Sequence, residues 1–343
     1  MHPLKIEGAS EEHRSIALGL LDRKTKPPGS LGRLEWLAAE LCAIQHAVPP
    51  VTARKRVLLF AGDHGIVAEG VSPYPQEVTG QMVRNFANGG AAINVLARQA
   101  GADLEVVDVG VVGAIDGLAL DRKVRSGTRN FAREQAITPA ELEQAMDVGF
   151  ERVHAAADNG VNVLALGEMG IGNTASASAL LSLMTGLDAT ETVGRGTGLD
   201  DAGLEHKQAV ISAAISFHAV AAHLPLEALC AVGGLEIAAL AGAMIASAAR
   251  RIPVLVDGFI CTVAALYAVR INPLCRSSLL FAHVSQERGH RLALAALNAY
   301  PFLDLGMRLG EGSGAALALP LVDASAAILR DMASFAEAGV TEV

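Results

Sequence analysis

The chain has 343 residues, of which 51% are hydrophobic and only 4% aromatic, and its formal net charge is −9. This length fits one large α/β domain or such a domain with a smaller appendage. The negative charge and the absence of a Lys/Arg cluster argue against a nucleic-acid-binding surface, which needs a basic stripe. The low aromatic content predicts a core of Ala, Leu, Val and Ile.

Nothing in the sequence predicts a membrane span or an export signal. The longest uncharged apolar run, IAALAGAMIASAA at 237–249, is shorter than the ~20 residues that cross a bilayer, so we expect a buried helix there. The N-terminal MHPLKIEGASEEHR has acids where a signal peptide needs an apolar segment. The cysteines are widely spaced and form no CxxC, which favours buried thiols in a reducing cytoplasm over disulfides or a metal site. They are Cys42, Cys230, Cys261 and Cys275.

Both ends of the chain have helical patterns. SLGRLEWLAAELCAIQ (30–45) repeats apolar residues at three- and four-residue spacing, with Ser30 as the predicted N-cap. The stretch from Val322 repeats the pattern. We therefore predict a small helical domain, formed by residues 1–50 and 322–343, beside an α/β catalytic domain at 51–321.

Between the ends, short apolar segments alternate with helical stretches. This alternation predicts a doubly wound, mainly parallel α/β sheet with helices on both faces. One intervening helix has clear limits, because Thr138-Pro139-Ala140-Glu141 resembles a capping box and Asn159-Gly160 would end it. The predicted strands are 56–65, 103–110, 162–170, 228–234, 253–258 and 278–285.

Polar residues or glycines follow each predicted strand. Ligands of open α/β sheets bind beyond the carboxyl ends of the strands, so these residues predict one shared site rather than scattered turns. They are Asp63, His64, Asp108, Glu168, Gly233, Gly234, Asp257, His283 and Ser285.

The loop GEMGIGNTASASA (167–179) is a candidate phosphate site. Gly170 and Gly172 let backbone N–H groups approach an anion, and Asn173 and Thr174 add donors where a helix begins. The loop has neither the lysine of a P-loop nor GxGxxG spacing, so neither nucleoside-triphosphate hydrolysis nor a dinucleotide fingerprint is supported. A tight turn without a ligand is the alternative.

A second glycine-rich loop, GRGTGLDDAGLEHKQAV (194–210), also leads into a helix. Gly196 frees the backbone, and Lys207 could reach a phosphate as a point charge, although by itself it is typical of a solvated helix residue. The Asp200-Asp201 pair follows a glycine loop rather than an apolar strand. It therefore does not match the ribose-binding pair of diphosphate-dependent phosphoribosyltransferases and is assigned to a helix N-terminus.

Three further segments carry weaker signals. AGDHG (61–65) has no HxxxH or HExxH partner, so a structural or substrate-orienting role is favoured over metal binding. For Asp257, at the end of PVLVDG, a pocket role and a turn role stay equally open. VSPYPQEVTGQM contains Tyr74 and Met82, which could line a flat aromatic ligand.

The segment RLGEGSGAALALP (308–320) isolates one acid, Glu311, among glycines and small apolar residues. A glutamate there could simply stabilise the positive end of a helix dipole. It could also be a catalytic base in a partly dry pocket, because burial raises the pKa of a carboxyl group.

Taken together, KPPGSLGRLE, GDHG, GEMGIGNT, VGG, PVLVDGF and above all RLGEGSGAALA are similar to nicotinate-nucleotide:dimethylbenzimidazole phosphoribosyltransferases, in the same order and along nearly the whole chain. The resemblance implies transfer of ribose 5-phosphate from nicotinate mononucleotide to 5,6-dimethylbenzimidazole, with inversion at C1′. This reaction belongs to cobalamin nucleotide-loop assembly. It also implies a Rossmann-like parallel core with a small helical domain, a homodimer, and no cofactor or metal.

The resemblance assigns roles to particular residues. Glu311 matches the general base of the family. The phosphate and ribose would be bound by Glu168, Gly170, Gly172, Asn173, Thr174, Gly196, Lys207 and Ser285. The acceptor base would be bound by Tyr74, Met82, Met169, Asp257 and Leu309.

Two other classes of protein fit less well. A nicotinamide-cofactor dehydrogenase would need GxGxxG after the first strand, where this chain has AGDHG. A non-catalytic nucleotide-binding protein would not need a lone acid in a dry loop.

Overall fold

The computed structural model describes residues 5–115, 117 and 119–341. The first four residues of the N-terminal segment used to argue against export lie outside these ranges, as do the last two residues of the predicted helical domain.

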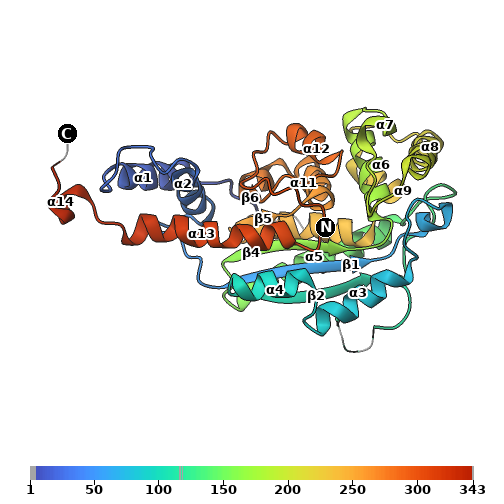
Figure 1. The fold of residues 1–343 in the computed structure, drawn as a ribbon, viewed down its shortest axis with the longest axis horizontal. Coiled ribbons are helices and arrows are strands. Elements are labelled where there is room, and N and C mark those ends of the chain that lie inside the picture. The colour runs from blue at the N-terminus through green and yellow to red at the C-terminus, as the bar shows by residue number, and fades with distance from the viewer. Residues whose placement is uncertain (1–4, 116, 118, 342–343) are drawn as a thin grey trace.

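A parallel sheet of six strands lies at the centre of the molecule (Figure 1). The strand order is β3-β2-β1-β4-β5-β6, and every neighbouring pair is parallel. From β1 the chain builds the sheet outward through β2 and β3, and then returns to add β4, β5 and β6 on the other side. The switch point, where open α/β sheets bind their ligands, therefore lies between the carboxyl ends of β1 and β4. The strands are β1 (Lys55–Gly62), β2 (Ala102–Gly110), β3 (Leu120–Asp121), β4 (Val163–Met169), β5 (Val254–Val256) and β6 (Leu279–Phe281).

Five of the predicted strands are confirmed, and the prediction at 228–234 is wrong. Residues 228–232 lie in helix α9 (Pro225–Val232), which begins with a proline at its first position, and Gly233 and Gly234 link it to the next helix. A short apolar run has the same pattern in a buried strand and in a buried helix, so periodicity alone could not separate them. The sixth strand is instead the two-residue β3, which is too short to leave a hydrophobic pattern.

Helices cover both faces of the sheet, which confirms the doubly wound fold. Side chains alternate along the strands: Leu58 and Phe60 face one hydrophobic cluster, while Val57 and Leu59 face the other. The first cluster includes α5 (Pro139–Asp158), α6 (Asn173–Thr185), α9, α10 (Leu235–Ala249), α11 (Phe259–Ile271) and α12 (His290–Ala296). The second includes α2 (Arg33–Gln45), α3 (Glu77–Ala87), α4 (Ala92–Gln99) and α13 (Ser313–Asp331).

The remaining elements are α1 (Glu11–Asp22), η1 (Gly65–Glu69), α7 (Ala189–Thr192), α8 (Asp201–His218), η2 (Pro273–Ser278) and α14 (Phe335–Ala338). Helix α5 has the predicted capping box at Thr138, and Asp200 caps α8 by accepting a hydrogen bond from the Gly203 N–H (2.8 Å). The predicted Ser30 cap is wrong, because α2 begins at Arg33 after a turn and has Gly32 at its N-cap. All four cysteines are buried, as expected.

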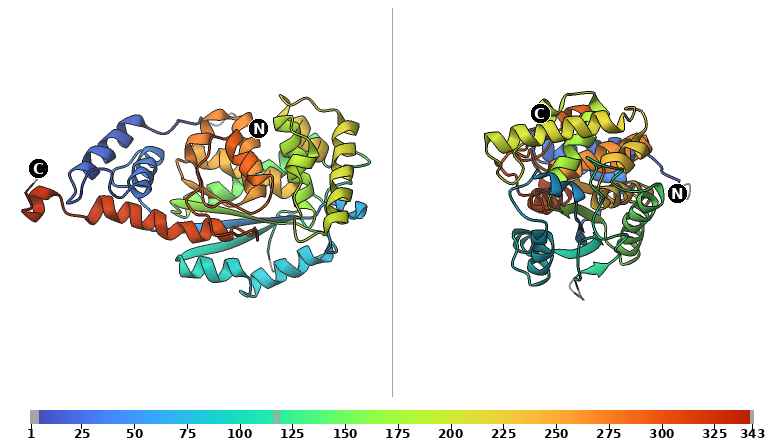
Figure 2. Two further views of the ribbon diagram at one scale, coloured as in Figure 1. Left: turned by 45° about the horizontal axis from the view of Figure 1, so that its top comes forward. Right: turned by 90° about the vertical axis from the view of Figure 1, so that its right-hand side faces the viewer.

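Helix α13 runs from the sheet to the far end of the molecule, where α1 and α2 lie beside it (Figures 1 and 2). A small apolar cluster that includes Leu21, Cys42 and Leu329 joins the three helices. Residue 322, the predicted start of the C-terminal part of the small domain, lies inside this continuous helix. By length and composition α13 could cross a membrane, but more than half of it is buried against the sheet and its neighbours, as in a core helix.

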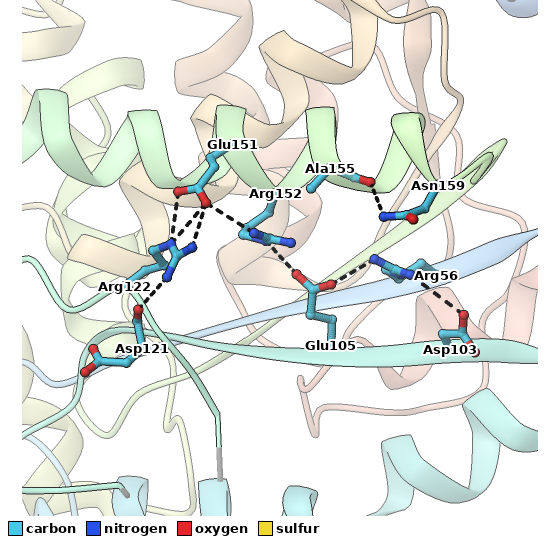
Figure 3. Close-up of polar contacts among 9 residues, drawn as sticks. All are labelled: Arg56, Asp103, Glu105, Asp121, Arg122, Glu151, Arg152, Ala155 and Asn159. Atoms are coloured by element: carbon cyan, nitrogen blue, oxygen red, sulfur yellow. Dashed lines mark hydrogen bonds and ion pairs between the residues drawn. The ribbon is translucent and has the colours of Figure 1, made fainter. Parts of the chain in front are cut away.

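Charged residues join α5 to the edge of the sheet. The carboxylate of Glu105 on β2 accepts hydrogen bonds from Arg56 on β1 (2.9 Å) and Arg152 on α5 (2.7 Å). Glu151, the residue before Arg152 on α5, accepts a hydrogen bond from Arg122, which follows β3 (Figure 3). Because Glu105 is largely buried and paired with two guanidinium groups, it fixes the position of α5 relative to β1 and β2.

Helices α5 and α10 pack with their backbones in direct contact. A β-carbon on Gly149 of α5 would collide with the carbonyl oxygen of Ala239, and one on Gly242 of α10 would collide with that of Met146. The small residues of the apolar run at 237–249 therefore allow a close helix crossing on the sheet.

We expect Gly242→Ala to lower the free energy of unfolding by ~1–3 kcal/mol, because the added methyl group must push the two helices apart. Gly19→Ala is the matched control, since Gly19 lies in α1 with nothing within 4 Å of the added carbon. The control should be neutral or stabilising by up to ~1 kcal/mol. Urea unfolding measures both, and equal effects of the two substitutions would contradict the close crossing.

Candidate active site

A cleft opens beyond the carboxyl ends of β4, β5 and β6, next to the switch point. Five loops form it: the loop after each of these three strands, the glycine loop before α8, and the segment before α13. Parallel strands bring these loops together although they are far apart in sequence. The lining residues are Glu168, Met169, Gly170, Ile171, Asn173, Thr174, Gly196, Thr197, Gly258, Phe259, Ile260, Ser285, Glu287, Arg308, Leu309, Gly310 and Glu311.

Glu311 is held in an unusual backbone conformation on the wall of this cleft. Its φ is 65°, and its neighbours Gly310 and Gly312 both have a φ of 83°. Its side chain is buried, and Oε2 has no hydrogen-bond partner among the described residues. The pKa of Glu311 is raised to about 7, mainly by burial and also by the nearby negative charge of Asp257. A hydrogen bond from the Ile93 N–H acts in the opposite direction and lowers it. A carboxylate of this kind can accept a proton near neutral pH.

Asp257, at the end of β5, holds the chain around Glu311. Its Oδ2 accepts a hydrogen bond from the Gly312 N–H (3.2 Å), and its Oδ1 accepts one from the Ala315 N–H (2.9 Å). Helix α13 has no side-chain cap of its own, so Asp257 supplies the cap from another element. His283 lies 3.6 Å from the same carboxylate, and a β-carbon on Gly314 would collide with the His283 ring.

Glu168 lies directly against this segment, since a β-carbon on Gly310 would be 2.5 Å from Glu168 Oε1, and it differs from Glu311 in its surroundings. Burial raises the pKa of Glu168 to about 8, and the negative charges of Asp257, Glu236 and Glu311 add to the rise. Its Oε2 accepts a hydrogen bond from the side-chain amide of Asn173, which acts in the opposite direction. Burial and the neighbouring acids therefore favour the protonated form of Glu168.

The loop between β4 and α6 brings a helix N-terminus to the cleft. Gly172 is the N-cap of α6 with a φ of 94°, a conformation that favours glycine. The Ile171 N–H donates to Thr79 Oγ1 of α3 (3.0 Å), which fixes the loop against its neighbour. A helix N-terminus with glycines before it is suited to bind a phosphate.

Lys207 of α8 is buried, not solvated. Its Nζ donates to Thr174 Oγ1 (2.8 Å) and lies 3.5 Å from the carbonyl oxygen of Gly194. Burial lowers the pKa of Lys207 to about 8, although the negative charge of Glu287 opposes this shift. The lysine therefore keeps its positive charge at neutral pH directly behind the loop between β4 and α6.

Ser285, after β6, completes this end of the cleft. Its N–H donates to His290 Nδ1 (2.7 Å), and its Oγ accepts from the Glu287 N–H (3.2 Å). Burial lowers the pKa of His290 to about 3, so the ring is neutral and can accept that hydrogen bond.

Comparison with known proteins gives one consistent result. The model of a family described as phosphoribosyltransferase matches residues 6–340. The nicotinate-nucleotide–dimethylbenzimidazole phosphoribosyltransferase of Bradyrhizobium diazoefficiens is 54% identical over 98% of this chain and 97% of its own length. The chain belongs to this phosphoribosyltransferase family.

Further members of the family agree along the same length. The enzyme of that name from Ralstonia nicotianae is 54% identical over 94% of this chain and 92% of its own length. The crystal structure of CobT from Thermus thermophilus superposes with a TM-score of 0.93 at 46% identity and covers 97% of this chain and 100% of its own. The phosphoribosyltransferase fold thus extends over nearly the whole chain.

The structure brings most of the residues assigned from the family resemblance into one cleft. Met169 and Leu309 line it together with Glu311. Tyr74 and Met82 do not line it: Tyr74 is 48% exposed before α3, and Met82 packs on the sheet from α3. The assigned phosphate and ribose residues all line the cleft except Gly172, which begins α6, and Lys207, which reaches Thr174 from behind.

Asp257, which the family resemblance assigns to the acceptor base, is fully buried. Asp257 does not line the cleft, and both of its carboxylate oxygens accept backbone hydrogen bonds. Its position supports a role in holding Glu311. Asp63 and His64 are likewise structural: Asp63 accepts from the Val112 N–H (2.7 Å), and His64 Nε2 lies 2.6 Å from Glu236 Oε1 in full burial.

Sequence reasoning missed three charged residues. Glu287 and Arg308 line the cleft, and Glu236 lies beneath Gly170. Arg308 is the first residue of the most specific motif and could have been noticed there, whereas nothing in the sequence near Glu236 indicates its contact with His64. Among the described residues, no group of three His, Cys, Asp or Glu side chains is arranged to hold a metal ion.

We expect Asp257→Asn to reduce both stability and activity. The asparagine amide can accept only one of the two backbone hydrogen bonds and presents its own N–H groups to the other backbone donor. The free energy of unfolding should therefore fall by ~1–3 kcal/mol. The substitution also removes a negative charge near Glu311, which should move the acid limb of the residual activity to lower pH.

Asp200→Asn is the control for this substitution, because asparagine caps a helix as well as aspartate does and α8 should be unaffected. Chemical denaturation and a pH–rate profile measure the two effects. A native-like stability and pH profile in Asp257→Asn would contradict the positioning role.

Proposed function

We propose that the chain transfers ribose 5-phosphate from nicotinate mononucleotide to a nitrogen of 5,6-dimethylbenzimidazole, releasing nicotinate and α-ribazole 5′-phosphate for cobalamin synthesis. The family and its named relatives support this reaction. The observation that carries the mechanism is the buried Glu311, with one unpartnered oxygen, in the same cleft as a phosphate-binding helix N-terminus.

The chemistry requires a base more than an acid. Nicotinate is a pyridinium in the nucleotide, so it leaves without being protonated. As one benzimidazole nitrogen bonds to C1′, the other becomes strongly acidic and must lose its proton. A carboxylate within hydrogen-bond reach accepts that proton, and this is the role that we propose for Glu311.

Glu311 fits the role of base better than the neighbouring acids. Asp257 has both oxygens engaged by backbone N–H groups. Glu168 has a pKa of about 8 and would be protonated at neutral pH, so it suits hydrogen-bond donation to substrate. Glu311 has a pKa of about 7 and a free oxygen. Two carboxyl groups with different surroundings can thus take different roles in one cleft.

The substrates would lie across the cleft. We propose that the phosphate binds at the 170–174 loop with help from Lys207 and Ser285. The acceptor would lie between Met169 and Leu309 beside Glu311, and Tyr74 and Met82 would reach it only after α3 and the segment before it move. Apolar walls discriminate weakly between acceptors, since one methyl group is worth ~1–3 kcal/mol, so several benzimidazoles should serve.

The strand order is shared with dinucleotide-binding folds, but the first strand does not end as theirs do. After β1 the chain enters the short η1 turn, with Asp63 and His64 buried in structural contacts. A helix N-terminus preceded by GxGxxG is not present there, so a dehydrogenase is disfavoured.

We further propose that the protein is a cytoplasmic homodimer. We also propose that residues 51–321 form the catalytic domain and that both ends of the chain form a helical domain.

The first test measures nicotinate release from nicotinate mononucleotide with and without 5,6-dimethylbenzimidazole. Release should depend on the acceptor and yield the α-riboside. In Glu311→Gln, turnover should fall ~10²–10⁴-fold while the nucleotide still binds, because glutamine keeps the shape but cannot take the proton. Release without acceptor would indicate a hydrolase. Near-native turnover in Glu311→Gln, together with loss in Glu168→Gln, would transfer the role of base to Glu168.

A second test uses pH. Glu311 must be ionised to act and its pKa is raised to about 7, so kcat/KM should increase as pH rises through that value. Lys207 must be charged to hold the phosphate and its pKa is lowered to about 8, so kcat/KM for the nucleotide should decrease above it. The profile should be bell-shaped. Lys207→Arg should remove the alkaline limb, because arginine stays charged, and an unchanged limb would exclude Lys207 as its cause.

A further inference from the structure

A fully buried pair, His64 and Glu236, lies beneath the loop between β4 and α6. His64 follows β1, and Glu236 lies in the first turn of α10, where the positive end of a helix favours a negative charge. Neither side chain is exposed, and His64 Nε2 lies 2.6 Å from Glu236 Oε1. With the carboxylate as acceptor, Nε2 donates this hydrogen bond.

Glycines from three separate motifs surround the Glu236 carboxylate. β-carbons on Gly62 and Gly234 would lie 3.1 Å and 2.8 Å from Oε2. A β-carbon on Gly170 would lie 3.4 Å from Oε1. These glycines belong to GDHG, VGG and GEMGIGNT, which are distant from one another in the sequence. The buried pair is therefore the point where the three motifs meet.

The loop proposed for the phosphate lies directly on this pair. A β-carbon on Gly170 would collide with the Gly62 carbonyl oxygen at 2.2 Å, so the loop and the end of β1 are in backbone contact. A β-carbon on Gly172 would lie 3.1 Å from the His64 β-carbon. The N–H of Thr174, which lines the cleft, donates to no group among the described residues. A displacement of the pair would therefore move the start of α6 and its available donor.

Stability alone does not explain the pair. Glu236 Oε2 and His64 Nδ1 are buried without a hydrogen-bond partner among the described residues. Buried polar atoms normally have partners, and a buried charged pair is often no more stable than apolar side chains of the same volume. The pair therefore indicates a role in holding the backbone around it in one arrangement.

We propose that His64 and Glu236 are positioning residues, whose hydrogen bond fixes the backbone at 170–172 so that the start of α6 can bind the donor phosphate. This inference rests on the proposed function and adds a pair of residues that contacts no substrate. A helix N-terminus binds a phosphate through several N–H groups at once, so a small displacement weakens these bonds together.

The experiment measures KM and kcat of Glu236→Met and Glu236→Gln with two donors and 5,6-dimethylbenzimidazole as acceptor. The donors are nicotinate mononucleotide and nicotinate riboside, which lacks the phosphate, and a donor that is not turned over is measured by its inhibition constant. In Glu236→Met, which loses the carboxylate acceptor, the nucleotide KM should rise ~10–100-fold while the riboside constant changes less than ~3-fold. In Glu236→Gln the amide oxygen still accepts from His64, so the nucleotide KM should stay within ~3-fold of the native value.

Glu105→Met is the matched control. Glu105 is also a largely buried carboxylate with basic partners, Arg56 and Arg152, but it does not line the cleft. Its substitution should lower the free energy of unfolding and leave both donor constants unchanged. If Glu236→Met does not fold, the double variant His64→Phe/Glu236→Met replaces the whole pair with apolar side chains of similar volume, and we expect the same rise in the nucleotide KM.

Three results would overturn the proposal. They are an unchanged nucleotide KM in folded Glu236→Met or in the double variant, an equal loss for nucleotide and riboside, and a loss in Glu236→Gln as large as in Glu236→Met. Calorimetric titration of the nucleotide without acceptor measures the same loss of affinity independently of turnover. If the native enzyme released no nicotinate in the presence of acceptor, the proposed function would fail, whereas the titration would still test the pair.

Discussion

The hydrogen bonds that Asp257 accepts from the start of α13 are the interaction on which the rest of the site depends. They join the end of β5 to the start of α13, and Glu311, two residues before that helix, has a left-handed backbone conformation. A buried carboxylate is costly unless its oxygens are satisfied, and here two backbone N–H groups satisfy it. These two hydrogen bonds stabilise the buried carboxylate of Asp257 and also hold the backbone next to Glu311 in place.

The same burial determines the chemistry of the cleft. Glu168, Glu236, Asp257 and Glu311 converge where the loops are packed too tightly for water to screen them: a β-carbon on Gly167 would lie 2.5 Å from the Glu311 carbonyl oxygen. Desolvation and mutual repulsion then raise the pKa values of Glu168 and Glu311 by different amounts. The two acids have different partners: the side-chain amide of Asn173 contacts Glu168, and the Ile93 N–H acts on Glu311. One cleft therefore holds a carboxylate that can accept a proton near neutral pH, Glu311, and a carboxyl group that favours its protonated form, Glu168.

The sequence predicted the sheet well where strands are long and buried on both faces, and it failed where length and pattern are ambiguous. The run at 228–234 has the hydrophobicity of a strand, yet the proline at the start of α9 and the partners around it make it a helix. Lys207 has the sequence context of a solvated residue, and its burial results from the packing of α8 against the loop between β4 and α6. Tyr74 and Met82 were assigned through the family resemblance, but their distance from the cleft depends on how α3 packs.

What the sequence by itself determined is therefore the alternation of strands and helices, the glycine-rich loops that follow strands, and the isolation of Glu311 among glycines. These features depend on neighbours along the chain, whose periodicity and backbone freedom can be recognised in the printed residues. Only the tertiary structure decided that Asp257 caps a helix 55 residues away, that Glu236 pairs with His64, and that Arg308 and Lys207 flank Gly196. Such contacts join residues distant in sequence, and they arise because parallel strands bring the ends of separate loops to one edge of the sheet.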